Sequence, residues 1–370
     1  MPDMEFRSGI LIVIALLFTF FVTYTTTPLV RKLAFRVGAV DIPKDNRRMH
    51  SKPIPTMGGL AIFVAFAFGV LAFVDLDPTF IGLLIGALMI IILGILDDIY
   101  NLKPYIKLLG QICAALVVCF SGVVIEKITW FDQIIFFGNW AIPITVIWIV
   151  GITNTINLID GLDGLACGVA AISSFALLAV SLLSAGNPTV TVVAAVLAGA
   201  CLGFLPYNLN PAKIFMGDAG AMFLGFVLSV ISIQGFFKVN AVVSFGIPFL
   251  VMGLPIVDTL WAILRRLAKG QHPFHADRKH LHHRLIDMGM NQKQSVTLLY
   301  AISSLLAIAA ILFAERQFTG AIIVLVLSFV VGAINWMVIK REHIQYMDEH
   351  PELKPEESSV EEHDQNTPQA

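Results

Sequence analysis

Long apolar runs separated by short polar segments dominate the chain from residue 8 to residue 339. A helix needs about 20 mostly apolar residues to cross the hydrocarbon core of a bilayer. Eleven segments come close to that length, the fifth with an extension toward Ile159. They cover residues 8–27, 57–74, 79–96, 106–125, 140–153, 165–184, 189–206, 219–237, 241–263, 296–314 and 318–339. The pattern predicts an all-α, polytopic membrane protein with about eleven transmembrane helices.

The composition supports this fold class and excludes others. Apolar residues make up 57% of the chain, charged residues 14%, and the mean hydropathy is +0.82, whereas a soluble domain is about half apolar and about a quarter charged. The net charge of −2 argues against a nucleic-acid partner. The four cysteines lie inside apolar runs, and no pair has the spacing of a zinc or redox motif, so we expect small buried thiols.

Lysine and arginine are distributed unevenly between the predicted loops, and cytoplasmic loops carry the excess. With the N-terminus outside, the inner segments hold 20 basic residues and the outer segments hold four, Arg7, Lys127, Lys238 and Arg316. The sequence therefore predicts that the N-terminus is outside and the C-terminus inside. An aromatic stretch at 126–139 on the outer side reads as a hairpin at the membrane surface.

The C-terminal segment differs from the rest of the chain. From Glu342 to Asp364 it holds nine acidic residues and one base, Lys354, with no apolar periodicity. Such a composition cannot bury enough apolar surface to fold alone. We therefore expect an integral membrane domain over residues 1–341 and an acidic, disordered cytoplasmic tail over 342–370.

Aspartates gather at the inner ends of separate predicted spans. Asp97 and Asp98 close the third span, Asp160 and Asp163 follow the fifth, and Asp218 opens the eighth. Ionisable residues at membrane segments are costly, so they are candidates for function. Clustered carboxylates repel one another unless a cation intervenes, and oxygen ligands suit Mg²⁺ or Mn²⁺. The alternatives are a solvated helix end, a helix cap at Asp218 and an Asx turn.

Asparagines precede two of these aspartates at regular spacing. Asn154, Asn157, Asp160 and Asp163 recur every three residues, which places them on neighbouring parts of one helical face. Their amides suit a ribose, a base or a metal. Phe215, shortly before Asp218, could stack on a nucleobase or serve as an interfacial aromatic residue.

Two inner loops are rich in basic residues and histidine. The loop at 265–284 ends with His280, His282, His283 and Arg284, which suit the binding of an anion. A zinc site and a patch for anionic lipid are the alternatives. The first inner loop adds four residues that could bind a diphosphate: Arg47, Arg48, His50 and Lys52. They could equally be charges that only set the topology.

Five blocks in this order resemble the polyprenyl-phosphate N-acetylhexosamine-1-phosphate transferases. The blocks are P-T-M-G-G at 55–59, L-D-D at 96–98, N-x-x-N-L-I-D-G-L-D-G-L-A at 154–166, P-A-K-I-F-M-G-D-A-G at 211–220 and D-R-K-H-L-H-H-R-L at 277–285. The resemblance covers about residues 8–340. The H-x-H-H-R-L order resembles the GlcNAc-1-phosphate branch, because the pentapeptide branch carries three consecutive histidines. Ala219 departs from the family's usual G-D-T-G.

The resemblance implies a catalytic and metal site. Asp218, with Asp98, would bind Mg²⁺ or Mn²⁺, and Asp97 and Asp98 would bind or activate the lipid phosphate. The other implied catalytic residues are Asp160, Asp163, His280, His282 and His283.

The resemblance also implies a substrate site, with Phe215 beside the uracil and the amides on the nucleotide. Its implied binding residues are Lys52, Asn154, Asn157, Phe215, Arg284, Arg47 and His50.

The implied reaction transfers GlcNAc-1-phosphate from UDP-GlcNAc to undecaprenyl phosphate and releases UMP, as the first membrane step of an envelope polysaccharide such as wall teichoic acid or O-antigen. We expect the enzyme in the cytoplasmic membrane of a bacterium, with its active site on the cytoplasmic face. A homodimer is left open. Another UDP-sugar, UDP-GalNAc or UDP-MurNAc-pentapeptide, is the first alternative. A cation transporter is a more distant alternative. Transporters place polar groups near the bilayer midplane, whereas the aspartates here lie at the inner ends of the predicted spans.

Overall fold

A computed structural model describes residues 2–43, 52–130, 133–183, 187–237, 246–270 and 280–349 of the chain. These residues are almost entirely helical. The α-helices are α1 (Pro2–Val37), α2 (Gly58–Phe73), α3 (Pro78–Tyr100), α4 (Pro104–Phe120), α5 (Ala141–Ile159), α6 (Leu165–Leu183), α7 (Pro188–Asn208), α8 (Gly217–Ser232), α9 (Gly246–Val251), α10 (Gly253–Ala268), α11 (Leu281–Asp287), α12 (Gln292–Ala314) and α13 (Phe318–Glu349). A 3₁₀ turn, η1 (Gly138–Trp140), precedes α5, and a π-helical turn, η2 (Ile233–Phe237), follows α8.

Local sequence signals set several helix starts. Asp77 accepts hydrogen bonds from the backbone N–H groups of Thr79 and Phe80 at the start of α3. Asn291 forms a reciprocal capping box with Gln294 at the start of α12. Such caps satisfy N–H groups that have no partner within the helix. They mark where each chain segment turns back into the bundle.

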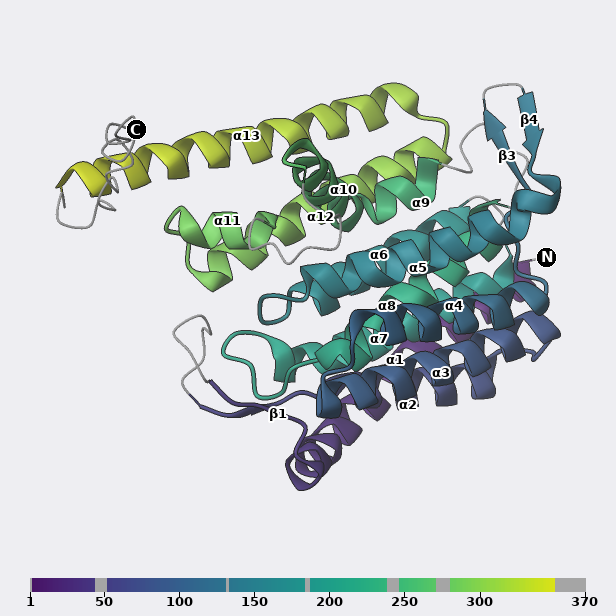
Figure 1. The fold of residues 1–370 in the computed structure, drawn as a ribbon. Helices are drawn as coiled ribbons and strands as arrows, with labels where there is room; N and C mark the ends of the chain where they lie inside the picture. The colour runs from purple at the N-terminus through teal and green to yellow at the C-terminus, as the bar shows by residue number, and fades with distance from the viewer. Residues whose placement is uncertain are drawn as a thin grey trace, which may run out of the picture.

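Successive helices run in opposite directions, so the loops collect at two ends of the bundle (Figure 1). One end holds the last turns of α3 and α5, the first turns of α6 and α8, and α11. The short ladder of β1 (Val40–Asp41) and β2 (Ile54–Pro55) lies at the same end. We call this the polar end. The N-terminus and the hairpin of β3 (Lys127–Trp130) and β4 (Gln133–Phe136) lie at the opposite end. The β3–β4 pairing confirms the predicted hairpin within 126–139, and its position at the outer membrane surface stays a prediction.

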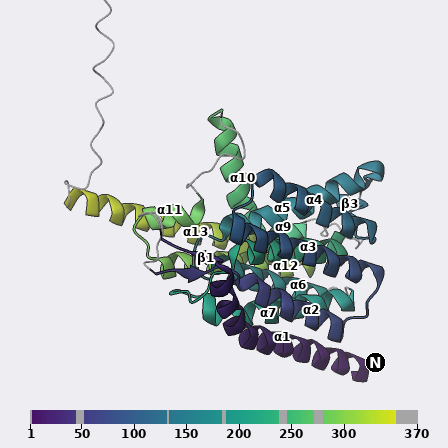
Figure 2. The same cartoon turned by 60° about the horizontal axis from the view of Figure 1, so that its bottom comes forward.

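Eight helices in the described part of the chain are long and apolar enough to cross a membrane, and α2 and α4 are shorter apolar helices. The protein is thus an all-α, multi-pass membrane protein. The segment predicted as the ninth span, 241–263, is not one continuous helix over its described part. It breaks at Met252 between α9 and α10, because Pro255 has no N–H to bond the carbonyl of Val251. Figure 2 shows α10 rising across the direction of the other helices.

Helix α8 lies at the centre of the bundle, and nearly all of its residues are buried. Two glycines on neighbouring helices allow this. A Cβ atom added to Gly59 of α2 would lie 2.1 Å from the Cα of Gly220, and one added to Gly94 of α3 would lie 2.2 Å from the Cα of Ala219. The backbones of α2, α3 and α8 therefore approach each other directly at the start of α8.

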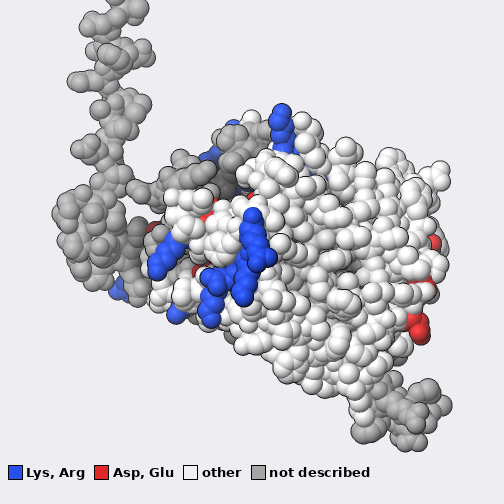
Figure 3. Space-filling model, turned by 90° about the horizontal axis from the view of Figure 1, so that it is seen from below, with Lys and Arg blue, Asp and Glu red and all other residues white. Residues whose placement is uncertain are grey.

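Charged residues lie toward the two ends of the bundle. On the face in Figure 3, lysine and arginine side chains gather toward the polar end together with some acidic atoms, further acidic side chains lie at the opposite edge, and a broad uncharged surface lies between. This is the surface expected of a protein embedded in a bilayer. Which end faces the cytoplasm stays a prediction.

Two further sequence predictions concern the tail and the cysteines. Helix α13 continues to Glu349, past the predicted domain boundary at 341, and residues 350–370 lie outside the described residues. The cysteines are free thiols, three of them buried and Cys113 exposed.

Candidate active site

Asp98 caps the N-terminus of α8. Its carboxylate accepts hydrogen bonds from the backbone N–H of Asp218 at 2.9 Å and of Ala219 at 3.4 Å. The first N–H groups of a helix lack helical partners and carry partial positive charge. Helix α8 has no cap from its own N-cap side chain, so the cap comes from α3. The Asp218 carboxylate is thereby left for other partners.

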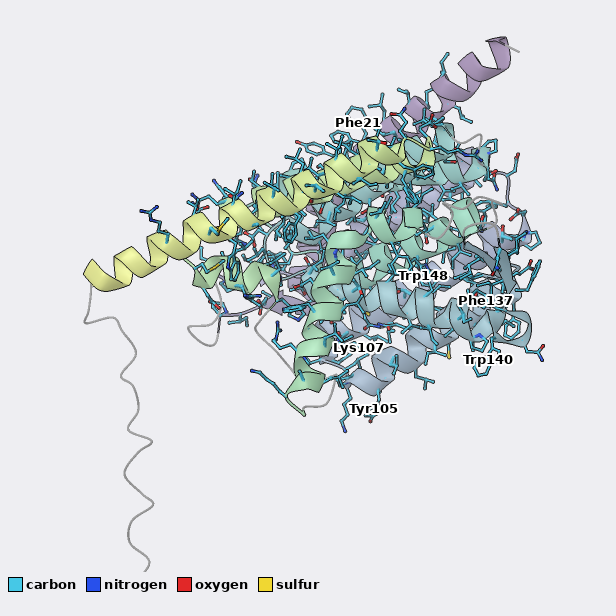
Figure 4. The ribbon with its side chains drawn as sticks, turned by 90° about the horizontal axis from the view of Figure 1, so that it is seen from above. Phe21, Tyr105, Lys107, Phe137, Trp140 and Trp148 are labelled. Atoms are coloured by element: carbon cyan, nitrogen blue, oxygen red, sulfur yellow. The ribbon has the colours of Figure 1, made fainter. Side chains whose placement is uncertain are left out.

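Lys107 joins two of the aspartates. Its ammonium group, in the second turn of α4, lies 2.8 Å from Asp97 Oδ2 and 2.8 Å from Asp218 Oδ2. Asp97 also accepts a hydrogen bond from the backbone N–H of Leu102 at 2.7 Å. Both oxygens of Asp97 are therefore occupied. Figure 4 labels Lys107 and Tyr105 near the start of α4, away from Phe137 and Trp140.

Backbone hydrogen bonds hold the block at 55–59 against the block at 211–220. The N–H of Phe215 donates to Pro55 O at 2.8 Å, and the N–H groups of Gly58 and Gly59 donate to Phe215 O at 2.9 Å and Met216 O at 2.8 Å. The block at 55–59 thus positions the loop that leads into α8. Its role in this geometry is structural.

Gly217 makes room for the aspartate cap. Its φ is +74°, which glycine adopts without strain. A Cβ atom there would lie 2.5 Å from Asp98 Oδ2. A side chain at this position would displace the carboxylate.

Asp160 and Asp163 lie in the turn between α5 and α6 and have different surroundings. Asp163 Oδ2 accepts hydrogen bonds from the Asn210 side chain at 2.9 Å and from the backbone N–H of Ala212 at 3.0 Å. It therefore anchors the loop that carries Phe215. No described residue hydrogen-bonds the side chain of Asp160.

Burial of its carboxyl group, together with the negative charges of Asp218 and Asp163, raises the pKa of Asp160 to about 8. A cation that bound beside Asp160 would relieve this cost. Asp160 is thus the carboxylate of this turn that is best placed to receive a ligand.

The two asparagines of the predicted row occupy different environments. The Asn154 amide donates to Gln111 Oε1 at 2.6 Å and to Val150 O at 2.8 Å, and its oxygen lies 3.4 Å from Gln111 Nε2. The Asn154 amide nitrogen and oxygen therefore already have hydrogen-bond partners. No described side chain or backbone group bonds the Asn157 amide, so Asn157 is the more available to a substrate.

Asp258 anchors the histidine block. Its carboxylate lies 2.9 Å from His280 Nδ1 and accepts a hydrogen bond from the Leu281 N–H at 2.8 Å. These three groups come from α10, from the N-cap residue of α11 and from its first residue. His280 and His282 stack at 6.0 Å, and His282 and His283 lie 4.2 Å apart between ring centroids.

His282 connects this block to the α5–α6 turn. Its Nε2 is buried without a hydrogen-bond partner in the described structure, and a Cβ atom on Gly161 would lie 2.2 Å from it. Burial and the neighbouring His283 lower the pKa of His282 to about 3. His282 is therefore a neutral ring packed against the glycine that follows Asp160.

The remaining predicted residues are less defined. Arg47 and His50 lie outside the described residues. Lys52 is exposed, and Phe215 is half-buried. The structure brings Asp97, Asp98 and Asp218 into one connected group.

Sequence reasoning missed Lys107, Gln111 and the anchoring role of Asp258. The signal for Lys107 was present, because a lysine inside a predicted span, 106–125, is costly unless it has a partner. Gln111, one turn further along α4, carries the same signal. Which carboxylates would meet Lys107 depends on packing between α3, α4 and α8.

A metal ion would find two suitable carboxylates here. In the described part of the chain no three His, Cys, Asp or Glu side chains gather into a metal-binding group. Mg²⁺, however, commonly uses one or two carboxylates together with substrate phosphates. Asp160, which receives no hydrogen bond from the described residues, and Asp218, which pairs with Lys107, fit that requirement.

Comparisons with known proteins identify the family of the chain. Residues 80–236 match the family model described as Glycosyl transferase family 4. A Bacillus subtilis protein named "Probable undecaprenyl-phosphate N-acetylglucosaminyl 1-phosphate transferase" is 41% identical over 303 residues, which are 81% of this chain and 84% of the relative.

Two further relatives extend the similarity to other bacteria. The decaprenyl-phosphate N-acetylglucosaminephosphotransferase of Mycobacterium tuberculosis H37Rv is 34% identical over 88% of this chain and 89% of its own length. The undecaprenyl-phosphate alpha-N-acetylglucosaminyl 1-phosphate transferase of Escherichia coli K12 is 28% identical over 84% and 86%. The chain therefore belongs to the polyprenyl-phosphate N-acetylglucosamine-1-phosphate transferase family.

Proposed function

We propose that the protein transfers GlcNAc-1-phosphate from UDP-GlcNAc to undecaprenyl phosphate and releases UMP. The observation that carries this proposal is the connected group of Asp97, Asp98, Lys107 and Asp218 at one end of a membrane bundle. Such an end can receive one substrate from the membrane and the other from water. The names of the three relatives support a polyprenyl phosphate acceptor, undecaprenyl phosphate in two names and decaprenyl phosphate in one, and the transfer of an N-acetylglucosamine phosphate group.

The chemical difficulty is that two anions must meet. Phosphoryl transfer depends on in-line placement and on neutralising charge. We propose that Asp218 and Asp160 hold Mg²⁺, which would supply the positive charge at the phosphates. Lys107 keeps the Asp97 and Asp218 carboxylates at fixed positions, and Asn157 is available to the nucleotide.

We favour direct attack by the lipid phosphate, with Asp98 as the base. Of the adjacent pair, Asp97 has both oxygens occupied at 2.7 and 2.8 Å, whereas Asp98 Oδ2 makes only a long contact of 3.4 Å. A covalent aspartyl intermediate is the alternative. Exchange of ³²P-labelled UMP into UDP-GlcNAc without lipid would support that alternative and count against direct attack.

We further propose that the protein starts an envelope polysaccharide, such as wall teichoic acid or O-antigen, from the cytoplasmic face of the inner membrane. The basic residues at the polar end support this placement. The position of the carboxylates at helix ends argues against a transporter, whose polar groups would lie near the bilayer midplane.

The test uses the purified full-length protein with undecaprenyl phosphate, Mg²⁺ and a panel of UDP-sugars. We expect UMP release with UDP-GlcNAc, lost on adding EDTA and reduced about 100-fold or more in Asp218→Asn. Asp75→Asn, an exposed carboxylate at the other end, is the matched control and should retain activity. Release with UDP-GalNAc or UDP-MurNAc-pentapeptide alone would reassign the substrate, and full activity of Asp218→Asn would remove its metal role.

A further inference from the structure

Helix α13 supplies a tryptophan to the histidine block. The guanidinium carbon of Arg284, on α11, lies 4.4 Å from the centroid of the Trp336 ring. Figure 1 shows α13 passing alongside α11 and α12 at the edge of the bundle. The last helix of the chain, far from the aspartates in sequence, thus reaches the loop that carries the histidines.

The contact uses only one part of the arginine. A guanidinium stacked on an aromatic ring presents its face to the ring, and its N–H donors stay in its own plane. No carboxylate among the described residues forms an ion pair with Arg284, whose adjacent residues on α11 are His283 and Leu285. Its guanidinium N–H donors are therefore not taken up by a described carboxylate, and such donors suit a phosphate.

The arginine needs support because its helix is short. Helix α11 has seven residues, and a helix of that length gains little stability of its own. Asp258 fixes its first residues, but Arg284 lies a turn later on a long, flexible side chain. The half-buried Trp336 is the described partner that restricts its position.

We propose that Trp336 is a positioning residue that holds Arg284 ready for the diphosphate of the nucleotide-sugar. The inference rests on the proposed function, since it requires an anionic substrate at Arg284. The diphosphate is charged before and during the reaction, so the contact strengthens binding in both states. Its loss should raise KM more than it lowers kcat.

Substitution at 336 separates this role from simple packing. In Trp336→Leu we expect KM for UDP-GlcNAc to rise about tenfold, with kcat changed less than about threefold, and Trp336→Phe to be intermediate. Trp140→Leu is the matched control, because Trp140 is 70% exposed at the opposite end of the bundle (Figure 4). It should keep the wild-type KM.

Two measurements test the electrostatic part of the contact. Fluorinated tryptophans incorporated at 336 keep the ring's shape but weaken its negative face, so KM should rise with each added fluorine. In Arg284→Lys, which already loses the stacked planar group, adding Trp336→Leu should raise KM little further.

The outcomes are distinct. A wild-type KM in Trp336→Leu, an unchanged KM across the fluorinated series, or fully independent effects of the two substitutions would overturn the proposal. Loss of thermal stability with an unchanged KM would make Trp336 a packing residue. Absence of turnover by the wild-type protein would overturn both ideas, whereas wild-type turnover with an unchanged KM in Trp336→Leu would overturn only the role of Trp336.

Discussion

The aspartates of the polar end are chemically alike, but their hydrogen-bond donors give them different tasks. Asp97 and Asp163 each receive donors at 3.0 Å or less, and Asp98 receives the first N–H groups of α8. Asp160 receives none from the described residues. A carboxylate whose donors are supplied by the protein fixes structure, whereas one without donors gains most from an added cation.

Substitution of Lys107 should show most clearly how far the ion pairs affect turnover and how far they affect stability. In Lys107→Met the Asp97 and Asp218 carboxylates lose their shared positive neighbour and repel each other. We expect kcat to fall about 100-fold, with Lys107→Arg less affected. Lys103→Met, an exposed lysine one turn earlier, is the control. UMP release and melting temperature measure both effects, and unchanged turnover in Lys107→Met would show that the bridge is not needed.

The raised pKa of Asp160 predicts a pH dependence of stability. Its pKa rises from an ordinary value of 3.8 to about 8, so the folded protein keeps a proton that the unfolded chain releases near pH 4. Between about pH 4 and pH 8 the metal-free protein should therefore lose stability as pH rises. Asp160→Asn has no such proton and should show a flatter profile.

The measurement is the melting temperature of EDTA-treated protein from pH 5 to pH 8. The wild-type value should fall by several degrees more than that of Asp160→Asn. Equal slopes would mean that Asp160 does not titrate in this range. Adding Mg²⁺ at pH 8 should recover stability in the wild type only.

At the level of elements, the sequence predicted most helices because each apolar run is long and ends at a polar or helix-capping residue. The sequence did not predict two features. Pro255 divides the predicted ninth span into α9 and α10, although the apolar run continues through it. Asp163 lies in the same motif as Asp160, yet its partners come from the α7–α8 loop. Such pairing depends on how the helices pack together, and the periodicity of apolar residues in the sequence does not show that packing.

The crossing of α2 and α8 should tolerate no side chain at Gly59. In Gly59→Ala the new methyl group would overlap the Gly220 backbone, so the helices must separate and disturb the start of α8. We expect a loss of about 2–3 kcal/mol in stability and a large loss of activity. Gly151→Ala in α5 has open space and should be neutral or slightly stabilising. Thermal unfolding in detergent compares the two, and equal melting temperatures would contradict the close contact.

For the whole molecule, the sequence predicted that distant motifs meet at one end, because an alternating bundle returns every second loop to the same side. It did not predict which side chains touch there. Lys107 meets Asp97 and Asp218 only because α3 packs against both α4 and α8. The end of the bundle was therefore predictable, and the ion pairs were not.

The orientation of the bundle decides whether this end can meet a cytoplasmic nucleotide. Lysine and arginine gather toward the polar end (Figure 3), which predicts that it faces the cytoplasm. In a variant without native cysteines, we expect Ile134→Cys in the β3–β4 hairpin to react with an impermeant thiol reagent on intact cells, and Asp287→Cys at the end of α11 to react only after permeabilisation. Both positions are exposed. The reverse pattern would place the aspartates outside, where cytoplasmic UDP-sugars do not reach them, and the proposed reaction would fail for that reason.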